Sequence, residues 1–326
     1  MNKTICLDPK YSSTRLLVTE RPQAADDENS ATHVMFFAPF RTGRQGEGGL
    51  RTKGYFKKTF PDKPLISVVT VVRNGEKYIE NTIQNVLGQD YDNVEYIIID
   101  GASKDKTVNV IRKYEHAIDY WVSEPDGGIY DAMNKGISLS SGEWINFMNA
   151  GDIFHGLDTL RTMKKFFLEK GDLLYGDARI AYKDFERVQP ANRFSSLWKG
   201  MICCHQSVFI RKTILTKYMF NTKYRFAADY DLLCRISQGG HSAIKIDKAV
   251  SRVISGGYVD TCRVDASREL KEVSGKFFKD KRLFTYIKYQ ILVLVISFKK
   301  GFSEKTIDFL THYKYHIRKQ SQTDET

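Results

Sequence analysis

The sequence predicts an α/β protein whose mixed, mostly parallel sheet is flanked by helices and followed by a helical C-terminal extension. Three apolar runs, at residues 65–72, 96–99 and 144–148, have the length and composition of buried strands. Segments with helical spacing separate them, which is typical of a parallel sheet with right-handed crossovers. Each run ends in polar or acidic residues, and open α/β sheets bind ligands at this carboxyl edge.

The elements of the first half follow from the spacing of their apolar residues. Residues 78–87 place Ile79, Ile83, Val86 and Leu87 on one helical face, and Gly88 ends this helix. The other elements expected in this half are helices at 107–114 and 129–139, strands at 118–123 and 143–148, and a turn at 124–128.

The ends of the chain and its second half are less regular. We expect strands at 172–180 and 207–210 and a helix at 229–236. The polar, irregular composition of residues 1–63 predicts a flexible, partly irregular extension with one short strand at 34–37. The glycine-rich stretch at 42–49 lacks the spacing of a phosphate-binding loop, and no strand closely precedes it.

Composition and charge narrow the class of protein. An apolar fraction of 42% and a charged fraction of 27% indicate a globular chain, and the formal net charge of +11 suits an anionic partner. The basic residues are dispersed without a recognised nucleic-acid motif, so a nucleic-acid partner is not expected. Five cysteines without disulfide-like spacing indicate a reducing compartment, and Cys203-Cys204-His205 lacks the second cluster that a zinc site needs.

One C-terminal segment suggests contact with a membrane. Residues 284–298 are strongly apolar and lie between lysine-rich flanks, including Lys299 and Lys300. The segment is shorter than the roughly 20 apolar residues of a membrane span, but it suits a helix lying in the interface of an anionic bilayer. The alternative is a helix that covers the core.

Four aspartates stand at strand ends or turns and could converge on one site: Asp100, Asp126, Asp152 and Asp229. Carboxylate oxygens bind the divalent cations that accompany diphosphates, and a carboxylate can also take the proton of a hydroxyl nucleophile. Asp100, like Asp105, could be an ordinary helix cap, and Asp126 could be a plain turn residue.

A longer pattern runs in order through residues 66–152. Its members are Asn74, Glu76, Gln89-Asp90-Tyr91, Asn93, Glu95, Asp100, Ser103, Asp105, Thr107, Asn134, Gly142-Glu143 and a turn that closes at Asp152. This pattern resembles the nucleotide-binding half of a family 2 glycosyltransferase with the inverting, Rossmann-like GT-A fold. Downstream, His205-Gln206 and Ala228-Asp229-Tyr230-Asp231-Leu232 with Arg235 resemble the acceptor-side motif of the same family.

The resemblance implies a role for each matching residue. Asp100 would bind the nucleotide base, usually uracil, and Asp152 would bind one Mn²⁺ or Mg²⁺ ion that bridges the donor diphosphate. Asp229 would be the catalytic base, with His205 and Gln206 on the acceptor side. The nucleotide-binding residues would be Val72, Asn74, Glu76, Asp100, Ser103, Asp126, Asn134 and Asn149.

Some positions depart from the family pattern. The metal-binding turn reads Asn149-Ala150-Gly151-Asp152 and keeps one carboxylate, and Ala228 replaces the glutamate that often precedes the base. Because Asp229 is retained, we interpret the chain as a divergent enzyme. Asp131 and Asn134 lie on an expected helix and could simply face solvent, and Asp231 is expected on a helix surface. His205 could equally be a core histidine.

The resemblance also divides the chain and suggests a function. The domains would be an extension at 1–63, a GT-A domain at 64–260 and a basic helical segment at 261–326. Within the GT-A domain, residues 64–152 would bind the nucleotide and residues 153–260 the acceptor. The expected reaction moves a sugar from a UDP-sugar to a glycan or a polyprenyl-diphosphate-linked acceptor in cell-surface polysaccharide synthesis, on the inner face of the cytoplasmic membrane.

Two other functions remain open. A catalytically weak nucleotide- or glycan-binding membrane scaffold of the same fold would explain the reduced metal turn. A nucleotidyltransferase would need a glycine-rich phosphate loop directly after the first strand, and Asn74-Gly75-Glu76 does not supply one.

Overall fold

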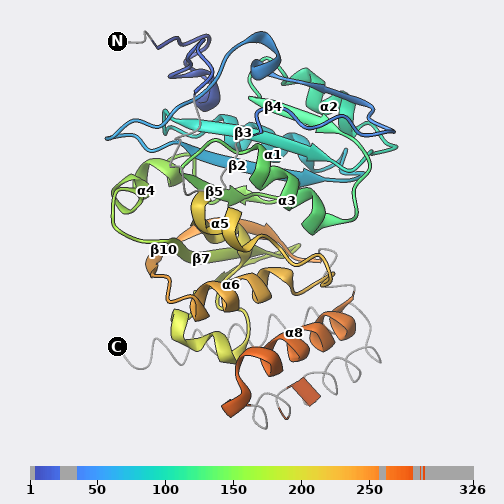
Figure 1. The fold of residues 1–326 in the computed structure, drawn as a ribbon, viewed down its shortest axis with the longest axis vertical. Coiled ribbons are helices and arrows are strands. Elements are labelled where there is room, and N and C mark those ends of the chain that lie inside the picture. Colours follow the sequence, from blue (N-terminus) through green and yellow to red (C-terminus); the bar gives the residue numbers. More distant parts are fainter. Residues whose placement is uncertain (1–3, 23–34, 257–261, 282–286, 288, 291–326) are drawn as a thin grey trace.

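The computed structural model describes residues 4–22, 35–256, 262–281, 287 and 289–290 of the chain. These residues form an α/β fold with one ten-stranded sheet, and the α/β class predicted from the sequence is confirmed (Figure 1). The strands are β1 (Gly46–Gly48), β2 (Ile66–Val72), β3 (Val94–Asp100), β4 (Tyr120–Ser123), β5 (Trp144–Phe147), β6 (Ile153–Phe154), β7 (Leu173–Ala181), β8 (Glu186–Gln189), β9 (Val208–Arg211) and β10 (Ala243–Ile254).

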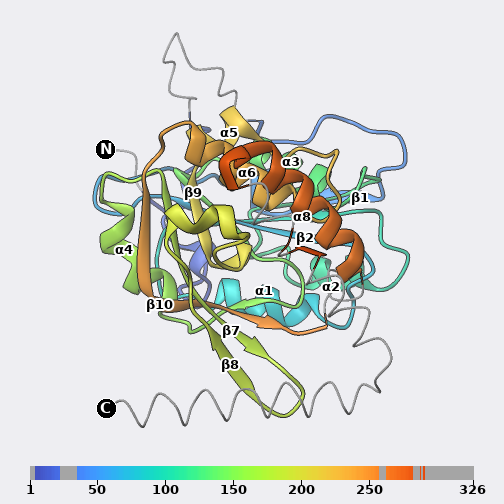
Figure 2. The ribbon, with the colours of Figure 1, turned by 90° about the horizontal axis from the view of Figure 1, so that it is seen from below.

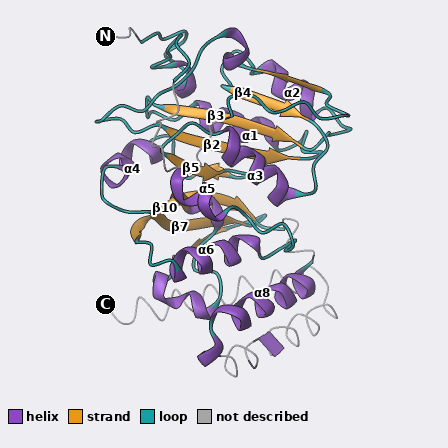
Figure 3. Ribbon diagram, in the orientation of Figure 1, coloured by secondary structure: helices purple, strands orange, loops and turns teal. Residues whose placement is uncertain are grey.

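Helices cover both faces of the sheet (Figure 3). The α-helices are α1 (Ile79–Leu87), α2 (Thr107–Lys113), α3 (Ile129–Leu139), α4 (Thr159–Phe167), α5 (Lys212–Tyr218), α6 (Ala228–Gln238) and α8 (Arg263–Phe277). Short 3₁₀ turns are η1 (Ser12–Thr14), η2 (Leu50–Lys53), η3 (Phe194–Lys199), η4 (His205–Ser207) and η5 (Lys279–Lys281). One apolar core lies under α1, α2 and α4, and the other lies under α3, α5 and α6.

The sheet is mixed, in the order β1-β4-β3-β2-β5-β9-β7-β10-β6, with β8 paired to β7. The central strands β4, β3, β2 and β5 are parallel, as their alternation with helices predicted. β9 joins β5 antiparallel and links this half to β7 and β10. β7 and β8 form a hairpin that projects from the sheet (Figure 2).

The predicted elements of the first half are confirmed, because local spacing and burial agree there. Ile79, Ile83, Val86 and Leu87 of α1 are all fully buried, and the helix ends at Gly88. β2 and β3 are buried along their whole length, as expected for strands covered on both faces.

The prediction of a strand at 34–37 is wrong for its described residues. Residues 35–37 form no strand, and Met35 donates one backbone hydrogen bond, to Ser138 O of α3 at 3.1 Å. Phe36 is buried all the same and packs edge-on against Phe56, with ring centroids 5.5 Å apart. The apolar run therefore supplies packing to the first half without joining the sheet.

The glycine-rich stretch is not a flexible extension. Its residues Gly46–Gly48 form β1, which pairs antiparallel with β4 and extends the sheet by one strand. The backbone of this strand lies on the ring of Trp121, where a Cβ atom on Gly48 would come 2.7 Å from Trp121 Nε1. The glycines are thus needed for close packing at this edge.

The helix α8 follows the sheet and packs on α6 and η3 (Figures 1 and 2). Apart from residues 287, 289 and 290, the apolar segment at 284–298 lies outside the described residues, so its predicted helix stays a prediction. Of the helices that the structure describes, none combines the length and apolar character needed to cross a membrane.

Candidate active site

The carboxyl ends of three central strands meet at one edge of the sheet. Val72 of β2 is paired with Asp100 of β3, and Asp100 is paired with Ser123 of β4. The Asp100 carboxylate is fully buried there and accepts hydrogen bonds from Ser103 N at 2.9 Å and Ser123 Oγ at 2.6 Å. A buried carboxylate held in this way stays in one orientation at the strand end.

Asn74 and Glu76 connect the two loops that follow these strands. Asn74 N donates to Ser103 Oγ at 2.7 Å, and Asn74 Oδ1 accepts from Lys104 N at 2.8 Å. Glu76 Oε2 accepts from Lys106 N at 2.9 Å. Asn74 has a left-handed φ of 52°, which asparagine tolerates better than most residues. Both side chains therefore fix the shape of this edge.

A cleft of about 900 Å³ opens beside this edge. Its lining comes from the end of β2, the start of α3 and the loop before α6, and consists of Val71, Val72, Arg73, Asp126, Gly127, Gly128, Ile129, Tyr130, Asp131, Ala132, Thr222, Tyr224 and Arg225. Asp126 Oδ1 accepts from Gly128 N at 3.0 Å, and burial raises the pKa of Asp126. The volume is that of a small-ligand site, and its charged lining combines two arginines, which suit phosphate oxygens, with two aspartates, which suit hydroxyl groups.

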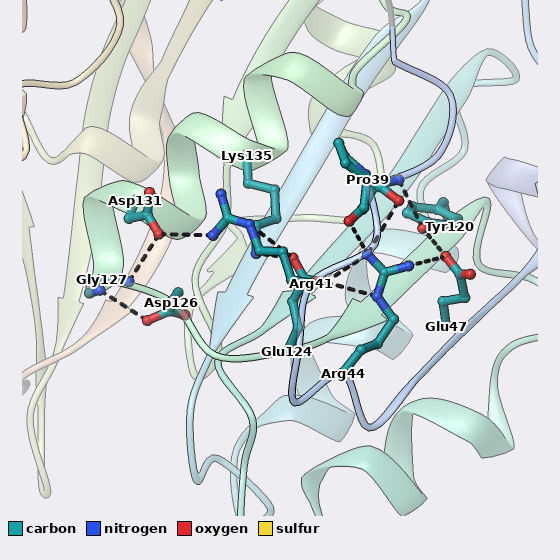
Figure 4. Close-up of polar contacts among 12 residues, drawn as sticks. Pro39, Arg41, Arg44, Glu47, Tyr120, Glu124, Asp126, Gly127, Asp131 and Lys135 are labelled. Carbon is teal, nitrogen blue, oxygen red and sulfur yellow. Dashed lines mark hydrogen bonds and ion pairs between the residues drawn. The ribbon is translucent and has the colours of Figure 1, made fainter.

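The loop at 124–128, which carries Asp126, is held from outside by the segment at 38–47 (Figure 4). Arg44 Nε donates to Glu124 Oε2 at 2.8 Å, and Lys135 of α3 donates to Glu124 Oε1 at 2.5 Å. Burial alone would raise the pKa of Glu124, but these two cations lower it. Glu124 is therefore a charged, buried anchor directly before the cleft-lining turn.

The turn after β5 carries Asp152. Gly151 has a φ of 104°, which favours glycine, and Thr82 of α1 fixes the turn by accepting from Gly151 N at 3.0 Å and donating to Asp152 O at 2.9 Å. Asp152 Oδ2 accepts from Gln206 Nε2 at 2.6 Å, and Oδ1 accepts from Ile254 N at 3.3 Å. Burial raises the pKa of Asp152 to about 6.

Asn149, from the same turn, is connected to Asp229 through His205. Asn149 Nδ2 lies 3.0 Å from His205 Nε2, and His205 Nδ1 lies 3.9 Å from Asp229 Oδ2. Burial lowers the pKa of His205 to about 4, so the imidazole is neutral at pH 7. We call Asn149, Asp152, His205, Gln206 and Asp229 the polar cluster; it joins residues that lie far apart in the sequence.

Asp229 lies in the first turn of α6, beside apolar groups. A recess of about 30 Å³ adjoins it, lined among others by Met133, Phe147 and Leu233. This burial raises the pKa of Asp229 to about 6. Asp229 Oδ1 accepts from Tyr230 N at 2.8 Å and lies 3.5 Å from the hydroxyl of Tyr130. Oδ2 is the oxygen that faces His205.

Two predicted positions differ in their surroundings. Asn134 Nδ2 donates to Phe220 O at 2.9 Å and its Oδ1 accepts from Phe220 N at 2.7 Å, so it is not a solvent-facing residue. The expectation that Asp231 lies on the helix surface is wrong. Its carboxylate is fully buried and accepts from Arg235 Nε at 2.6 Å and Lys276 Nζ at 3.2 Å.

Sequence reasoning missed Tyr130, Arg73 and Arg225. Tyr130 lines the cleft and also reaches Asp229, so it connects the cleft to the polar cluster. Its helical spacing with Met133 and Ile137, which are buried, could have indicated an inward orientation. Nothing in the local sequence marks Arg225, because the loop before α6 reaches the cleft through the tertiary fold.

The polar cluster fits a divalent cation only in part. Among the described residues, no group of three or more histidine, cysteine, aspartate or glutamate side chains is arranged to hold a metal ion. However, Asn149 Oδ1 is buried and has no hydrogen-bond partner within the described structure, and it shares a turn with the Asp152 carboxylate. One carboxylate with a neutral oxygen suits Mg²⁺ or Mn²⁺ when substrate phosphates supply further ligands.

Comparison with known proteins identifies the family. The model of the family described as glycosyl transferase family 2 matches residues 67–233, which is just over half of the chain and includes both the cleft and the polar cluster. The chain belongs to glycosyl transferase family 2. The predicted family is therefore confirmed, and the protein is a glycosyltransferase.

Curated relatives agree with this assignment. An uncharacterized glycosyltransferase of Mycobacterium tuberculosis is 30% identical over 219 residues, which are 65% of this chain and 81% of the relative. A PGL/p-HBAD biosynthesis glycosyltransferase of Mycobacterium bovis is 29% identical over 180 residues, which are 53% of this chain and 69% of that protein.

Solved structures share the fold of this family 2 glycosyltransferase. The mannosyltransferase PcManGT of Pyrobaculum calidifontis, in complex with GDP-Man and Mn²⁺, has a TM-score of 0.54 at 18% identity. The superposition covers 82% of this chain and 85% of PcManGT. S. aureus TarS in complex with UDP-GlcNAc has a TM-score of 0.52 at 18% identity and covers 64% of this chain and 66% of its own. The likeness confirms the GT-A fold.

Proposed function

We propose that this glycosyltransferase moves a sugar from a nucleotide-sugar donor, in the first place a UDP-sugar, to an acceptor hydroxyl with inversion at the anomeric carbon. One observation carries the proposal: Asp229, His205, Asn149 and Asp152 converge beside a cleft whose lining includes Tyr130, a contact of Asp229. A cleft for an anionic donor and a carboxylate base next to it are the two parts that such a transfer needs.

The nucleotide would occupy the edge formed by β2, β3 and β4. Asp100 is the acceptor for the base in this proposal, with Val72, Asn74, Glu76 and Ser103 shaping the edge and Asn134 bracing Phe220 near α3. Asp126 would contact the ribose or the diphosphate from the turn before α3, where its carboxylate lies against Gly101. Arg73 and Arg225 line the same cleft and would balance the charge of the diphosphate.

Asp229 would take the proton of the acceptor hydroxyl as that oxygen attacks the anomeric carbon and the nucleoside diphosphate departs. With a pKa of about 6, Asp229 is mostly ionised at pH 7 and still basic enough to accept a proton. Tyr230 N–H occupies Oδ1, which leaves Oδ2 for the acceptor. The neutral His205 does not form an ion pair with this carboxylate, and with Gln206 it would orient the acceptor.

Asp152 and Asn149 would hold the divalent cation of the donor. A bound Mn²⁺ or Mg²⁺ ion would neutralise negative charge that grows on the departing diphosphate. Gln206 orients the Asp152 carboxylate through its 2.6 Å hydrogen bond. Because Asp152 is the carboxylate of this turn, we expect the cation to bind together with the nucleotide.

The acceptor in this proposal is a glycan or a lipid-linked oligosaccharide at the cytoplasmic face of the membrane. The relative from Mycobacterium bovis is named for PGL/p-HBAD biosynthesis, which is compatible with a cell-surface product. The apolar segment at 284–298 and its flanking lysines support attachment to an anionic bilayer.

The first test is calorimetric titration of UDP and GDP, with and without Mn²⁺, into the wild type and Asp152→Ala. We expect UDP to bind in a Mn²⁺-dependent manner, and the variant to lose that dependence. If neither nucleotide binds under any condition, the transferase proposal fails. The single carboxylate of the metal turn would then favour a catalytically inactive scaffold of the same fold.

A further inference from the structure

A carboxylate from outside the family-matched region binds the backbone directly before the helix that carries Asp229. Glu269 of α8 reaches the loop before α6 and accepts three backbone hydrogen bonds. Its Oε1 accepts from Arg225 N at 3.0 Å, and its Oε2 accepts from Phe226 N at 2.7 Å and Ala227 N at 3.0 Å. Residue 269 lies well beyond residue 233, where the family match ends.

These contacts hold the three residues that lead into α6, at a helix start that has no side-chain cap of its own. The residue before the helix is Ala227, which has no side-chain oxygen, and no side-chain cap is made at this position. The first N–H groups of a helix need acceptors from outside, and a negative charge beside them is favourable. Glu269 places a negative charge beside this helix start, and the three N–H donors on its carboxylate fix the position of the 225–227 backbone firmly.

The backbone held in this way lies between the two functional regions. On one side, Tyr224 and Arg225 line the cleft. On the other side, Asp229 follows Ala227 by two residues and lies within the first turn of α6. A shift of the 225–227 backbone would therefore move a cleft wall and the base carboxylate together.

We propose that Glu269 is a positioning residue for sugar transfer, which sets the orientation of Asp229 through the 225–227 backbone. The inference rests on the proposed function, since it assumes that Asp229 is the base. In this proposal α8 contributes to the reaction through Glu269, which holds the 225–227 backbone and does not itself contact the substrates.

The test compares Glu269→Ala and Glu269→Gln with Asp265→Asn. Asp265 lies four residues earlier on α8 and is exposed, and its carboxylate pairs with Arg268 of the same helix at 3.1 Å. It therefore controls for loss of one charge from α8. The probe reaction is hydrolysis of UDP-glucose, UDP-N-acetylglucosamine, UDP-galactose or GDP-mannose, in which water replaces the unknown acceptor.

We expect Glu269→Ala to lower kcat by at least about tenfold, because small displacements of a catalytic group have large effects. Glu269→Gln should fall between Ala and wild type, since its one oxygen can accept some of the three bonds. The Kd for UDP should rise by a clearly smaller factor than kcat falls, since the other cleft walls stay in place, and peptides covering 225–231 should exchange backbone hydrogen faster. Asp265→Asn should match the wild type in all of these measurements.

Two results would overturn the inference. The first is a folded Glu269→Ala protein with faster exchange at 225–231 but wild-type kcat, which would make the contact structural only. The second is an equal loss of kcat and UDP affinity, which would indicate general disorder of the cleft. Failure of the proposed function is seen separately, in a wild type that hydrolyses none of the four donors, and that result overturns both proposals.

Discussion

The charged form of Asp229 lowers the free energy of unfolding of the protein. Burial raises its pKa from the ordinary 3.8 to about 6, and the neighbouring His205, with a pKa of about 4, carries no charge that could compensate. The folded state therefore binds a proton at Asp229 more tightly than the unfolded chain does. Ionisation at pH 7 weakens the fold, as is common for groups tuned for catalysis.

We predict that Asp229→Asn slows transfer strongly and stabilises the protein. Loss of a general base lowers kcat by about 10²–10⁴-fold, and removal of the buried charge raises the free energy of unfolding by up to about 3 kcal/mol at pH 7. The gain should be full above pH 6 and vanish as the pH falls toward 4, where Asp229 is protonated in the folded protein. Urea unfolding at several pH values measures it, and wild-type kcat should itself decline below about pH 6.

Asp231→Asn is the matched control, with the opposite expectation. Asp231 is buried with the partly exposed Arg235 and Lys276 as partners, so its neutralisation weakens two charge-assisted hydrogen bonds and costs about 1–3 kcal/mol. If Asp229→Asn destabilised the protein as Asp231→Asn does, Asp229 would be a structural ion-pair member and its assignment as the base would be wrong.

These two aspartates also show what could be predicted at the scale of single residues. The motif register favoured Asp229 as the base, and that assignment remains a prediction. The burial of Asp231 was missed because one of its two partners is distant in the sequence. Arg235 is a local (i, i+4) neighbour, but Lys276 comes from α8. Similarly, no local signal shows that Glu269 binds the backbone of residues 225–227 before α6.

At the scale of elements, prediction succeeded where burial is continuous. β2 and α1 have clean apolar patterns and lie at the centre of the fold, so their limits agree with the sequence within one residue. β10 was missed because its burial follows no regular alternation and its pairing with β7 is interrupted by register shifts. β1 was missed because three residues with two glycines have little strand propensity.

We predict that Arg44→Ala weakens nucleotide binding through the loop at 124–128. Arg44 is largely buried, and its loss leaves Glu124 with Lys135 as its near partner. The free energy of unfolding should fall by about 1–3 kcal/mol, and the Kd for UDP should rise by about tenfold as the Asp126 turn loosens. Calorimetry and urea unfolding measure the two effects.

Arg161→Ala is the control for loss of an arginine from an ion pair. Arg161 of α4 pairs with Asp90, in the loop after α1, and with Asp158, directly before α4. All three side chains are well exposed, so removal of Arg161 should change stability by less than about 1 kcal/mol. An Arg44→Ala protein with wild-type affinity for UDP would mean that the segment at 38–47 stabilises the sheet edge without shaping the cleft.

At the scale of the whole molecule, the family-matched region is not a complete account of the site. The match ends at residue 233, but β10, which supplies the Ile254 N–H contact to Asp152, and α8, which supplies Glu269 to the start of α6, both follow it. The sequence after residue 233 therefore carries groups that contact Asp152 directly and hold the loop that leads to Asp229.

The net charge of +11 and the apolar segment at 284–298 predict that the full chain binds anionic vesicles. It should float with phosphatidylcholine vesicles that contain phosphatidylglycerol, more weakly with phosphatidylcholine alone, and less at high salt, because each lysine near the surface contributes about 1 kcal/mol. Reversing two charges in Lys299→Glu/Lys300→Glu should weaken binding by at least about tenfold. The same change in net charge made on α4, Lys164→Glu/Lys165→Glu, should have a smaller effect. Equal losses in the two double variants would mean that overall charge, and not the C-terminal segment, attracts the protein to the bilayer.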